Sequence, residues 1–361
     1  MNTSEPVPRT SISLIPPYHP GKRVTGAVKL SSNENPLGCS ARVPAAIQGM
    51  MNELEVYPDG RGAQLVHQLS DLHGVAPERI VLGNGSDDIM IMAAATFIEP
   101  GFNAVMAATT FSQYAFATRL FGGEIRQVPL AEGSHDLPAM LDAIDEKTKI
   151  VWVCNPNNPT GTYRSHTEIR GFLDAVPSHV LVVLDEAYSE YADAEDFPNS
   201  TKLLNDYPNL LVLHTFSKIY GLAALRLGYG FSSPQIIENF LRVKQPFNVN
   251  SLALAAGSVS LEDTNFVERS LQVNREGMQY LTGELERLGL DYYPSQANFV
   301  CIHTPIPAQE AYETILRYGI TVRSLQSFGM MHAIRVSIGD TSALQSLVQG
   351  LSAICHQAAV K

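Results

Sequence analysis

The stretch Thr215-Phe216-Ser217-Lys218 decides how the rest of the chain is interpreted. It ends the apolar run 210–213, and Arg226 follows after seven intervening residues. A lysine at the end of a buried strand, beside hydroxyl groups and an arginine, suits an imine with an aldehyde cofactor that carries a phosphate. Taken alone, such a lysine is more often a solvated surface charge. The other strand ends therefore have to be compared with this one.

The composition is that of an ordinary soluble globular protein. The 361 residues are 45% hydrophobic and 17% charged, and this length predicts two domains. A net charge of −11 argues against nucleic acid or an anionic membrane as the main partner, because both favour basic proteins. No run is long enough to span a bilayer, and residues 1–22 lack a signal-peptide stretch. With four cysteines that lack metal-ligand spacing, these features predict a cytoplasmic protein without a metal site.

Prolines and apolar runs divide the chain into three parts. Residues 1–28 contain five prolines, which predict an extended arm without regular helix that packs on a partner subunit. Residues 29–253 hold short, continuous apolar runs between helix-like segments, which predict a parallel sheet buried on both faces. Residues 254–361 predict a smaller α+β domain. The expected strands and helices include 80–82, 89–97, 149–154, 180–184, 210–213, 266–288, 298–302, 309–317, 333–338 and a last helix from residue 342.

Three further runs end in polar groups, at the edge where parallel sheets bind ligands. The first is followed by Gly83-Asn84-Gly85-Ser86-Asp87-Asp88, in which backbone amides at a helix N-terminus suit a phosphate. The second leads into 155–161, rich in asparagine and proline, and the third into Asp185-Glu186-Ala187-Tyr188. Each has a plainer interpretation, as a capped turn, a proline turn or a helix-capping aspartate.

Asp185 is the most informative of these groups. A carboxylate at a buried strand end is costly unless a cation pairs with it, and a protonated pyridine nitrogen is such a cation. The spacings from Asn158 to Asp185 and from Asp185 to Lys218 each leave room for a helix and a strand, so the three side chains are expected at one edge. A lysine, an acid and a phosphate corner together predict pyridoxal 5'-phosphate (PLP) as cofactor.

In this order and spacing, the segments resemble those of aminotransferases of PLP fold type I, and most of all the histidinol-phosphate aminotransferase family. The resemblance covers nearly the whole chain and implies an α/β, aspartate-aminotransferase-like fold. That fold has a large domain with a mostly parallel sheet flanked by helices, and a smaller α+β domain. The segments that carry the resemblance are 30–38, 57–58, 83–88, 157–161, 185–188, 215–218, 221–226, 245–248 and 333–337.

The resemblance implies which residues bind the cofactor. Lys218 would form the imine and later move the proton, and Asp185 would keep the pyridine nitrogen protonated. Asn158 and Tyr188 would bind the ring hydroxyl oxygen, while Phe111 would stack on the ring. The residues implied around the phosphate are Gly85, Ser86, Asp87, Thr215, Ser217, Arg226 and Tyr57. In the family, the tyrosine at the position of Tyr57 reaches the phosphate bound by the neighbouring subunit, which implies a homodimer.

Four residues are implied to bind the substrate: Tyr18, Asn35, Arg323 and Arg335. The two arginines match family residues that bind the anionic groups, because guanidinium groups suit a phosphate dianion. Tyr18 lies in the arm and would reach across the dimer. On the strand 333–338 the apolar residues alternate with Arg335, which places its side chain on the other face from them.

The chain departs from the family pattern at three positions. Asp88 stands where glutamate is usual and Ala224 where glycine is common, and neither change is expected to alter the chemistry. Phe111 stands where tyrosine is frequent, which keeps a stacking surface but removes a hydroxyl group. Substrate preference is the property that this last change affects.

The predicted reaction is transamination between L-histidinol phosphate and 2-oxoglutarate, giving imidazole-acetol phosphate and L-glutamate in histidine biosynthesis. Two related activities stay open: an aromatic (phenylalanine or tyrosine) aminotransferase and a PLP-dependent phospho-amino-acid decarboxylase. A dinucleotide-binding enzyme is disfavoured because Asp88 replaces the third glycine of that fingerprint. An NTPase is disfavoured because no phosphate-loop sequence is present, and a non-catalytic regulator because Lys218 is retained.

Overall fold

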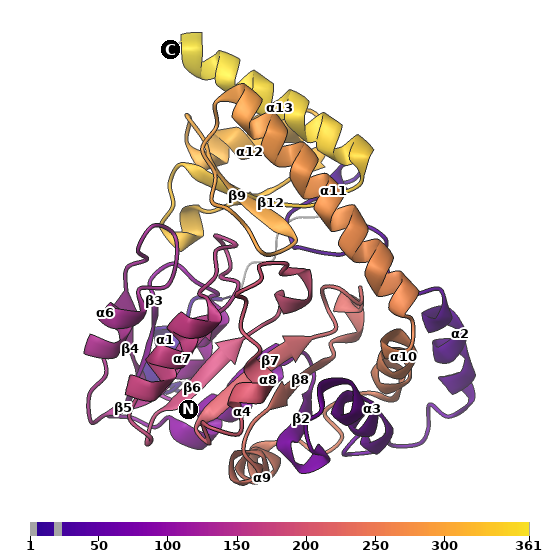
Figure 1. The fold of residues 1–361 in the computed structure, drawn as a ribbon, viewed down its shortest axis with the longest axis vertical. Coiled ribbons are helices and arrows are strands. Elements are labelled where there is room, and N and C mark those ends of the chain that lie inside the picture. Colours follow the sequence, from indigo (N-terminus) through magenta and orange to yellow (C-terminus); the bar gives the residue numbers. More distant parts are fainter. Residues whose placement is uncertain (1–5, 18–23, 361) are drawn as a thin grey trace, which may run out of the picture.

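The computed structural model describes residues 6–17 and 24–360. Figure 1 shows a larger part built around a central sheet and a smaller part at the top, where the C-terminus lies. The strands of the central sheet are β2 (Ile80–Gly83), β3 (Asn103–Ala107), β4 (Glu124–Val128), β5 (Thr148–Cys154), β6 (Leu181–Asp185), β7 (Leu210–Thr215) and β8 (Gly228–Phe231). Their order is β2-β8-β7-β6-β5-β3-β4, and β8 runs in the opposite direction to the other six strands.

Helices cover both faces of this sheet. The helices on one face are α4 (Ser86–Phe97), α5 (Gln113–Leu120) and α9 (Pro234–Val243). Those on the other are α2 (Arg42–Gly49), α3 (Ala63–His73), α6 (Leu137–Asp142), α7 (His166–Ala175), α8 (Ser200–Leu203) and α10 (Ser251–Leu261). Successive strand residues enter opposite cores, as Val182 and Val183 do. Burial on both faces explains why these strands have continuous apolar sequences.

The smaller part has its own apolar core. It contains a three-stranded antiparallel sheet in the order β11-β12-β9. Its elements are β9 (Phe299–His303), β10 (Ile320–Thr321), β11 (Arg323–Ser324), β12 (Ala333–Ser337), α11 (Thr264–Leu288), α12 (Ala308–Leu316) and α13 (Thr341–Val360). The long helix α11 joins the two parts, because Val267 packs on the first core and Leu285 belongs to the second (Figure 1).

The segment before the large sheet also belongs to the smaller part. Strand β1 (Val28–Lys29) pairs in parallel with β10, and Leu30 is buried in the smaller core. This pairing carries residues 31–35 toward the carboxyl ends of β6 and β7. Short 3-10 turns complete the chain: η1 (Met50–Asn52), η2 (Pro77–Arg79), η3 (Ser189–Tyr191), η4 (Ala223–Leu225) and η5 (Gln326–Phe328).

The predicted arm differs from expectation in one respect. Residues Thr10–Ser13 form one helical turn, α1, that packs on α5 of the same chain, and Arg9 donates a hydrogen bond to the carbonyl of Leu120 at 2.8 Å. The prediction that the arm lacks regular helix is therefore wrong. Residues 10–13 contain no proline, so nothing in the turn itself removes a helical hydrogen bond.

The predicted mostly parallel, helix-flanked sheet with a smaller α+β unit is confirmed. The expected strands and helices differ from the observed ones by only a few residues at their ends. Strand β8 has no counterpart among the apolar runs, because Gly228 and Gly230 interrupt its sequence. The division of the chain at residues 28/29 and 253/254 stays a prediction.

Candidate active site

The carboxyl ends of the central strands open into a cavity of about 730 Å³ between the two parts. Both parts of the molecule line it. Ser31, Ser32 and Asn33 come from the segment after β1, and Arg323 and Arg335 from the smaller sheet. The larger part contributes residues at or after its strand ends, among them Ser86, Asp87, Phe111, Cys154, Asn158, Asp185, Tyr188, Thr215, Ser217, Lys218 and Arg226. The sequence therefore predicted most of the polar lining of one cavity.

One corner of the cavity is built to hold an anion. Helix α4 begins at Ser86, so its first backbone amides are free of partners within the helix. Gly85 has a φ of 85°, and a Cβ atom there would lie 2.4 Å from Nη2 of Arg226. A Cβ atom at Gly228 would lie 2.3 Å from the amide nitrogen of Ser86. Two glycines thus let the backbone and a guanidinium group approach each other closely.

Arg226 brings positive charge to this corner. Its Nη1 donates to Oγ of Ser217 at 3.3 Å, and its Nη2 lies 3.3 Å from Oδ2 of Asp87. Burial raises the pKa of Asp87, while the charge of Arg226 lowers it. Thr215 is buried behind the corner and its hydroxyl accepts from the amide of Ser217 at 3.1 Å. A cation, hydroxyl groups and helix amides together suit a phosphate.

Asp185 ends β6 on the floor of the cavity and is 3% exposed. Its Oδ2 accepts a 2.6 Å hydrogen bond from the hydroxyl of Tyr114, and its Oδ1 accepts from the amide of Ala187 at 3.2 Å. Burial raises the pKa of Asp185 to about 6, against the hydrogen bond from Tyr114, which lowers it. A buried carboxylate of this kind binds a cation strongly.

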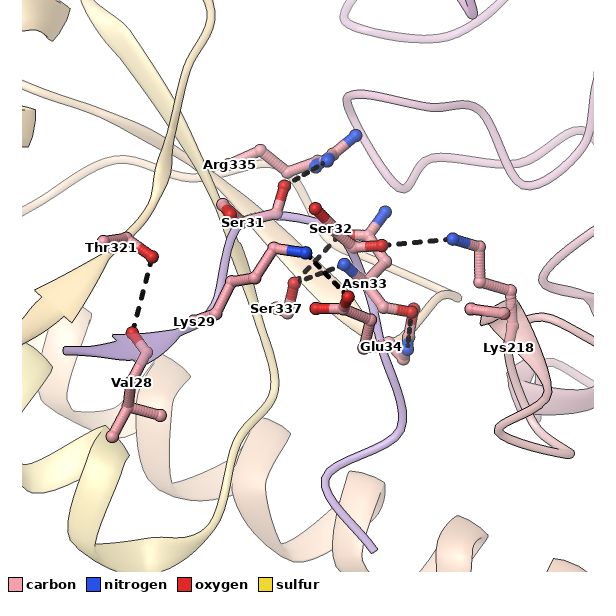
Figure 2. Close-up of polar contacts among 12 residues, drawn as sticks. Val28, Lys29, Ser31, Ser32, Asn33, Glu34, Lys218, Thr321, Arg335 and Ser337 are labelled. Carbon is pink, nitrogen blue, oxygen red and sulfur yellow. Dashed lines mark hydrogen bonds and ion pairs between the residues drawn. The ribbon is translucent and has the colours of Figure 1, made fainter. Parts of the chain in front are cut away.

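Lys218, in the turn after β7, lines the same cavity as Asp185. Its Nζ donates to the carbonyl of Ser32 at 3.1 Å (Figure 2). The same atom lies 5.5 Å from the centre of the Tyr188 ring. Burial, followed by the charge of Arg335, lowers the pKa of Lys218 to about 8. A fraction of the amine is then neutral near neutral pH, which is the form that attacks a carbonyl carbon.

A chain of hydrogen bonds joins the two parts above these groups. Tyr188 accepts from the amides of Asn33 at 2.9 Å and Asn158 at 3.5 Å, and burial raises its pKa. Arg335 donates to Oδ1 of Asn158 and, at 2.9 Å, to the carbonyl of Ser31 (Figure 2). The side chain of Arg335 is 7% exposed and is held in place.

Arg323 and Arg335 occupy directly opposed positions on β11 and β12. Opposed residues of an antiparallel pair project from the same face, and two like charges there repel each other unless an anion lies between them. Arg323 lies 6.0 Å from the centre of the Phe328 ring and donates to Oγ of Ser327 at 3.4 Å. Both arginines line the cavity, and a pair of this kind suits an anion.

Two predicted site residues lie outside the cavity, and a third is not among the described residues. Asn35 does not line the cavity, because its amide donates to the carbonyl of Ile219 at 2.8 Å and to Ser270 at 2.9 Å. Tyr57 lies on the surface with 78% of its area exposed, stacked on Phe247 at 4.7 Å. Tyr18 falls outside the described residues. Phe111, by contrast, lines the cavity as expected.

Two residues whose side chains contact the predicted site residues were missed from the sequence. Asn33 donates to Tyr188 from a backbone with a φ of 58°, which asparagine tolerates better than most residues. Tyr114 lies in the first turn of α5 and donates to Asp185. Asn33 belongs to the segment 30–38 that carries the resemblance, whereas no local pattern in the sequence indicated Tyr114.

Metal-binding clusters and membrane-spanning helices are not found in the described part of the chain. Among residues 6–17 and 24–360, no group of three or more His, Cys, Asp or Glu side chains is placed to hold a metal ion. No helix within those same ranges is long and apolar enough to cross a membrane.

Comparison with known proteins shows the family to which the chain belongs. The family model for aminotransferase class I and II matches residues 25–351. The chain is a class I and II aminotransferase. Among curated relatives, this aminotransferase is 43% identical over 353 residues to the histidinol-phosphate aminotransferase of Geobacillus sp. (strain WCH70), covering 95% of this chain and 97% of that one. It is 46% identical over 339 residues to histidinol-phosphate aminotransferase 2 of Pseudomonas fluorescens (strain Pf0-1), covering 91% and 92%.

Solved structures agree with these relatives. The aminotransferase superposes on histidinol-phosphate aminotransferase from Sinorhizobium meliloti, solved in complex with pyridoxal-5'-phosphate, with a TM-score of 0.85. The two chains are 27% identical, and 92% of this chain and 91% of that one are covered. Superposition on a Thermus thermophilus aspartate aminotransferase variant gives a TM-score of 0.84 at 20% identity. This second likeness shows a shared fold only. The predicted family and the aspartate-aminotransferase-like fold are therefore confirmed.

Proposed function

We propose that this aminotransferase uses PLP to exchange amino groups between L-histidinol phosphate and 2-oxoglutarate. The products are imidazole-acetol phosphate and L-glutamate, and the reaction belongs to histidine biosynthesis. The single observation that carries the proposal is the convergence of Lys218, Asp185 and the α4 anion corner in one cavity that also holds two opposed arginines. The relatives that cover nearly the whole chain are named histidinol-phosphate aminotransferases.

The donors in the cavity fit PLP group by group. The α4 amides, Ser217 and Arg226 would hold the phosphate. The corner is open because Gly85 and Gly228 carry no Cβ atoms. Asp185 would pair with the ring nitrogen and Lys218 would bind the aldehyde carbon. When bound, PLP supplies an electron-withdrawing ring that makes the substrate's Cα proton removable.

The roles of the remaining cofactor-site residues follow from their contacts. Tyr188 and Asn158 would bind the ring hydroxyl oxygen, since Asn158 donates to the hydroxyl of Tyr188 and the Tyr188 ring lies 5.5 Å from the Lys218 amine. Phe111 would cover one face of the ring. Thr215 would orient Ser217 at the phosphate corner, because its hydroxyl accepts a hydrogen bond from the backbone amide of Ser217.

Nζ of Lys218 is the base that takes up the Cα proton. Burial holds the pKa of Lys218 at about 8, so the free amine is available near neutral pH. The carbonyl of Ser32 orients Nζ by accepting its hydrogen bond. Asp185 stays ionised when a cation faces it, because a nearby positive charge favours the carboxylate.

The substrate's anionic group would lie between Arg323 and Arg335. An anion there relieves the repulsion between the two guanidinium groups and accepts paired hydrogen bonds from them. A phosphate, with charge near −2, matches two arginines better than a single carboxylate does. This match supports histidinol phosphate over phenylalanine or tyrosine as amino donor.

We also propose a cytoplasmic homodimer. Tyr57 and Phe247 form an exposed aromatic pair, and Met51, Leu54 and Val56 beside it are more than half exposed. A partner subunit covering this surface would receive Tyr57 at its own phosphate corner. Co-expression of the Tyr57→Ala and Lys218→Ala chains tests this, because the mixed dimer then holds one complete site. Activity above that of either variant alone is expected, and no recovery in a demonstrated mixed dimer would contradict the shared site.

A panel of amino donors tests the proposed substrate. Initial rates with 2-oxoglutarate are measured for L-histidinol phosphate, L-phenylalanine, L-tyrosine and L-threonine phosphate, with release of carbon dioxide followed in parallel. Fastest turnover of histidinol phosphate is expected. A higher kcat/KM for an aromatic amino acid, or carbon dioxide release from threonine phosphate, would replace the proposal with the corresponding alternative.

A further inference from the structure

A buried cluster of charged groups lies directly behind the candidate active site. Its centre is His214, the β7 residue four positions before Lys218, which is 5% exposed. Nε2 of His214 lies 3.5 Å from Oε2 of Glu186, and Nδ1 lies 3.9 Å from Oε1 of Glu190. Glu186 is itself 4% exposed. The cavity described above does not include His214, Glu186 or Glu190.

The two carboxylates lie on either side of Tyr188 in the chain. Glu186 directly follows Asp185, and Glu190 belongs to the short turn η3. The segment from Asp185, the last residue of β6, to η3 therefore carries both residues that line the cofactor position, and His214 contacts it before and after Tyr188. We propose that protonated His214 is a positioning residue that clamps this segment, fixes Asp185 and Tyr188, and thereby makes cofactor retention depend on pH.

Hydrogen-bonding chemistry supports the cationic form of His214. Nδ1 lies 3.4 Å from Oγ of Ser189, which already donates to the carbonyl of Glu186 at 2.9 Å and so can accept from the ring. In a neutral ring, one nitrogen would be an acceptor turned toward these oxygen atoms. Only the cation offers a donor to both sides. The 3.5 Å contact between Nε2 and Glu186 does not have hydrogen-bond geometry, so its strength depends on charge.

No lysine or arginine among the described residues forms an ion pair with either glutamate. The described pairs of Glu186 and Glu190 are both with His214, while Ser200 donates to Oε1 of Glu186. Burial raises the pKa of Glu186 to about 7, and the charge of His214 opposes that rise. Losing the imidazolium charge leaves a buried carboxylate without a cation, which is strongly unfavourable.

The groups packed around His214 agree with a single positive charge there. The titratable groups that face it are Glu186, Glu190, Asp185, Tyr229 and His73. Tyr229 stacks on the ring at 5.1 Å, and His73 lies 5.6 Å away. Burial, and then the charge of His214, lowers the pKa of His73 to about 3, so this neighbour stays neutral. Burial lowers the pKa of His214, but Glu190 and Glu186 outweigh it and raise the pKa above 6.5.

The direction of the pH effect follows from this shift. A histidine whose pKa is higher in the folded protein stabilises it fully below the unfolded value, and this contribution is lost as pH rises through the folded value. The clamp is therefore closed near neutral pH, where His214 is protonated and its glutamates are ionised, and it is released in alkaline solution. Replacing His214 by a neutral residue imposes the released state at every pH.

The inference rests on the proposed use of PLP, and the experiment separates the two. PLP dissociation constants of the full-length protein are measured by absorbance titration across the pH range, with thermal unfolding of the PLP-free protein alongside. His214→Gln removes the charge and His214→Arg keeps a permanent one. His67→Gln is the matched control, because that imidazole is exposed on α3. Near neutral pH, His214→Gln is expected to bind PLP on the order of tenfold more weakly than the unaltered protein, a typical coupling between two sites.

In alkaline solution this difference between His214→Gln and the unaltered protein should vanish, while His214→Arg should bind PLP with less dependence on pH. Equal affinities of His214→Gln and the unaltered protein at every pH would overturn the clamp. If His214→Arg does not fold, a double-mutant cycle of His214→Gln and Glu190→Gln replaces it. The clamp requires the losses of PLP affinity in the two single variants to be non-additive in the double variant, and additive losses refute it. Absence of PLP binding by the unaltered protein would sink the proposed function instead, and the clamp would then be judged by the unfolding midpoints alone.

Discussion

Replacing Asp185 by asparagine is expected to stabilise the PLP-free protein while weakening its hold on PLP. Burial raises the pKa of this carboxyl group from 3.8 to about 6. A carboxyl group whose pKa is higher in the folded than in the unfolded protein contributes stability below about 3.8, and this contribution is lost as pH rises through about 6. The shift of roughly two units corresponds to about 3 kcal/mol of lost stability near pH 8.

Asparagine fits the same position without that cost. Its Oδ1 can accept from the amide of Ala187, and its amide group can donate to the hydroxyl oxygen of Tyr114. Guanidinium unfolding of the PLP-free proteins gives the free energy of unfolding. The Asp185→Asn variant should be more stable by about 3 kcal/mol near pH 8 and by about half as much near pH 5, because the folded aspartic acid is then mostly protonated.

The control is Asp193→Asn, which alters an exposed aspartate and should leave stability within about 0.5 kcal/mol. The reasoning is refuted if Asp185→Asn is no more stable than the unaltered protein near pH 8, or if its advantage is the same near pH 5. In PLP titrations the same variant should bind more weakly, because no anion then faces the pyridine nitrogen. Stability and cofactor affinity thus change in opposite directions.

Three further substitutions test neighbouring contacts. Tyr114→Phe removes the 2.6 Å hydrogen bond to Asp185 and should lower the free energy of unfolding by about 2 kcal/mol. The control Tyr163→Phe removes an exposed hydrogen bond of the same length, to Asp196, and should lower it by under about 1 kcal/mol in the same denaturation assay. Equal losses in the two variants would contradict the role of burial. Lys218→Ala should abolish turnover while far-UV circular dichroism stays native, and retained turnover would exclude the lysine as base. Arg335→Lys keeps the charge but loses the paired geometry, so kcat/KM for histidinol phosphate should fall about tenfold or more, and unchanged kinetics would place the substrate anion elsewhere.

The sequence predicted the part of the site that lies at strand ends. Parallel strands buried on both faces have continuous apolar sequences, and the polar residue that follows each one lies at the ligand edge. Asn158, Asp185 and Lys218 could therefore be placed together from their positions after these runs. The resemblance to a known family then assigned Arg323 and Arg335, and these arginines prove to be opposed across β11 and β12.

Other features had no local pattern to reveal them. The contact of Tyr114 with Asp185 depends on how α5 lies against β6, which residue spacing does not specify. Asn35 belongs to a motif beside the site, yet its side chain turns toward Ile219 and Ser270. The helical turn at Thr10–Ser13 was masked by the prolines around it, because composition averages over a segment and a single turn needs only four permissive residues.

Ser31 and Ser32, which follow β1, contribute to the cavity through their main-chain carbonyl groups. The carbonyl of Ser31 accepts from Arg335 and that of Ser32 accepts from Lys218 (Figure 2). Every residue type carries a carbonyl oxygen, so these positions should tolerate side-chain replacement far better than a change in length. Losing or gaining one residue between 29 and 33 would shift both oxygen atoms out of step with their donors. Scanning mutagenesis would score Ser31 and Ser32 as dispensable, and only deletion or insertion libraries would expose how tightly their main chain is constrained.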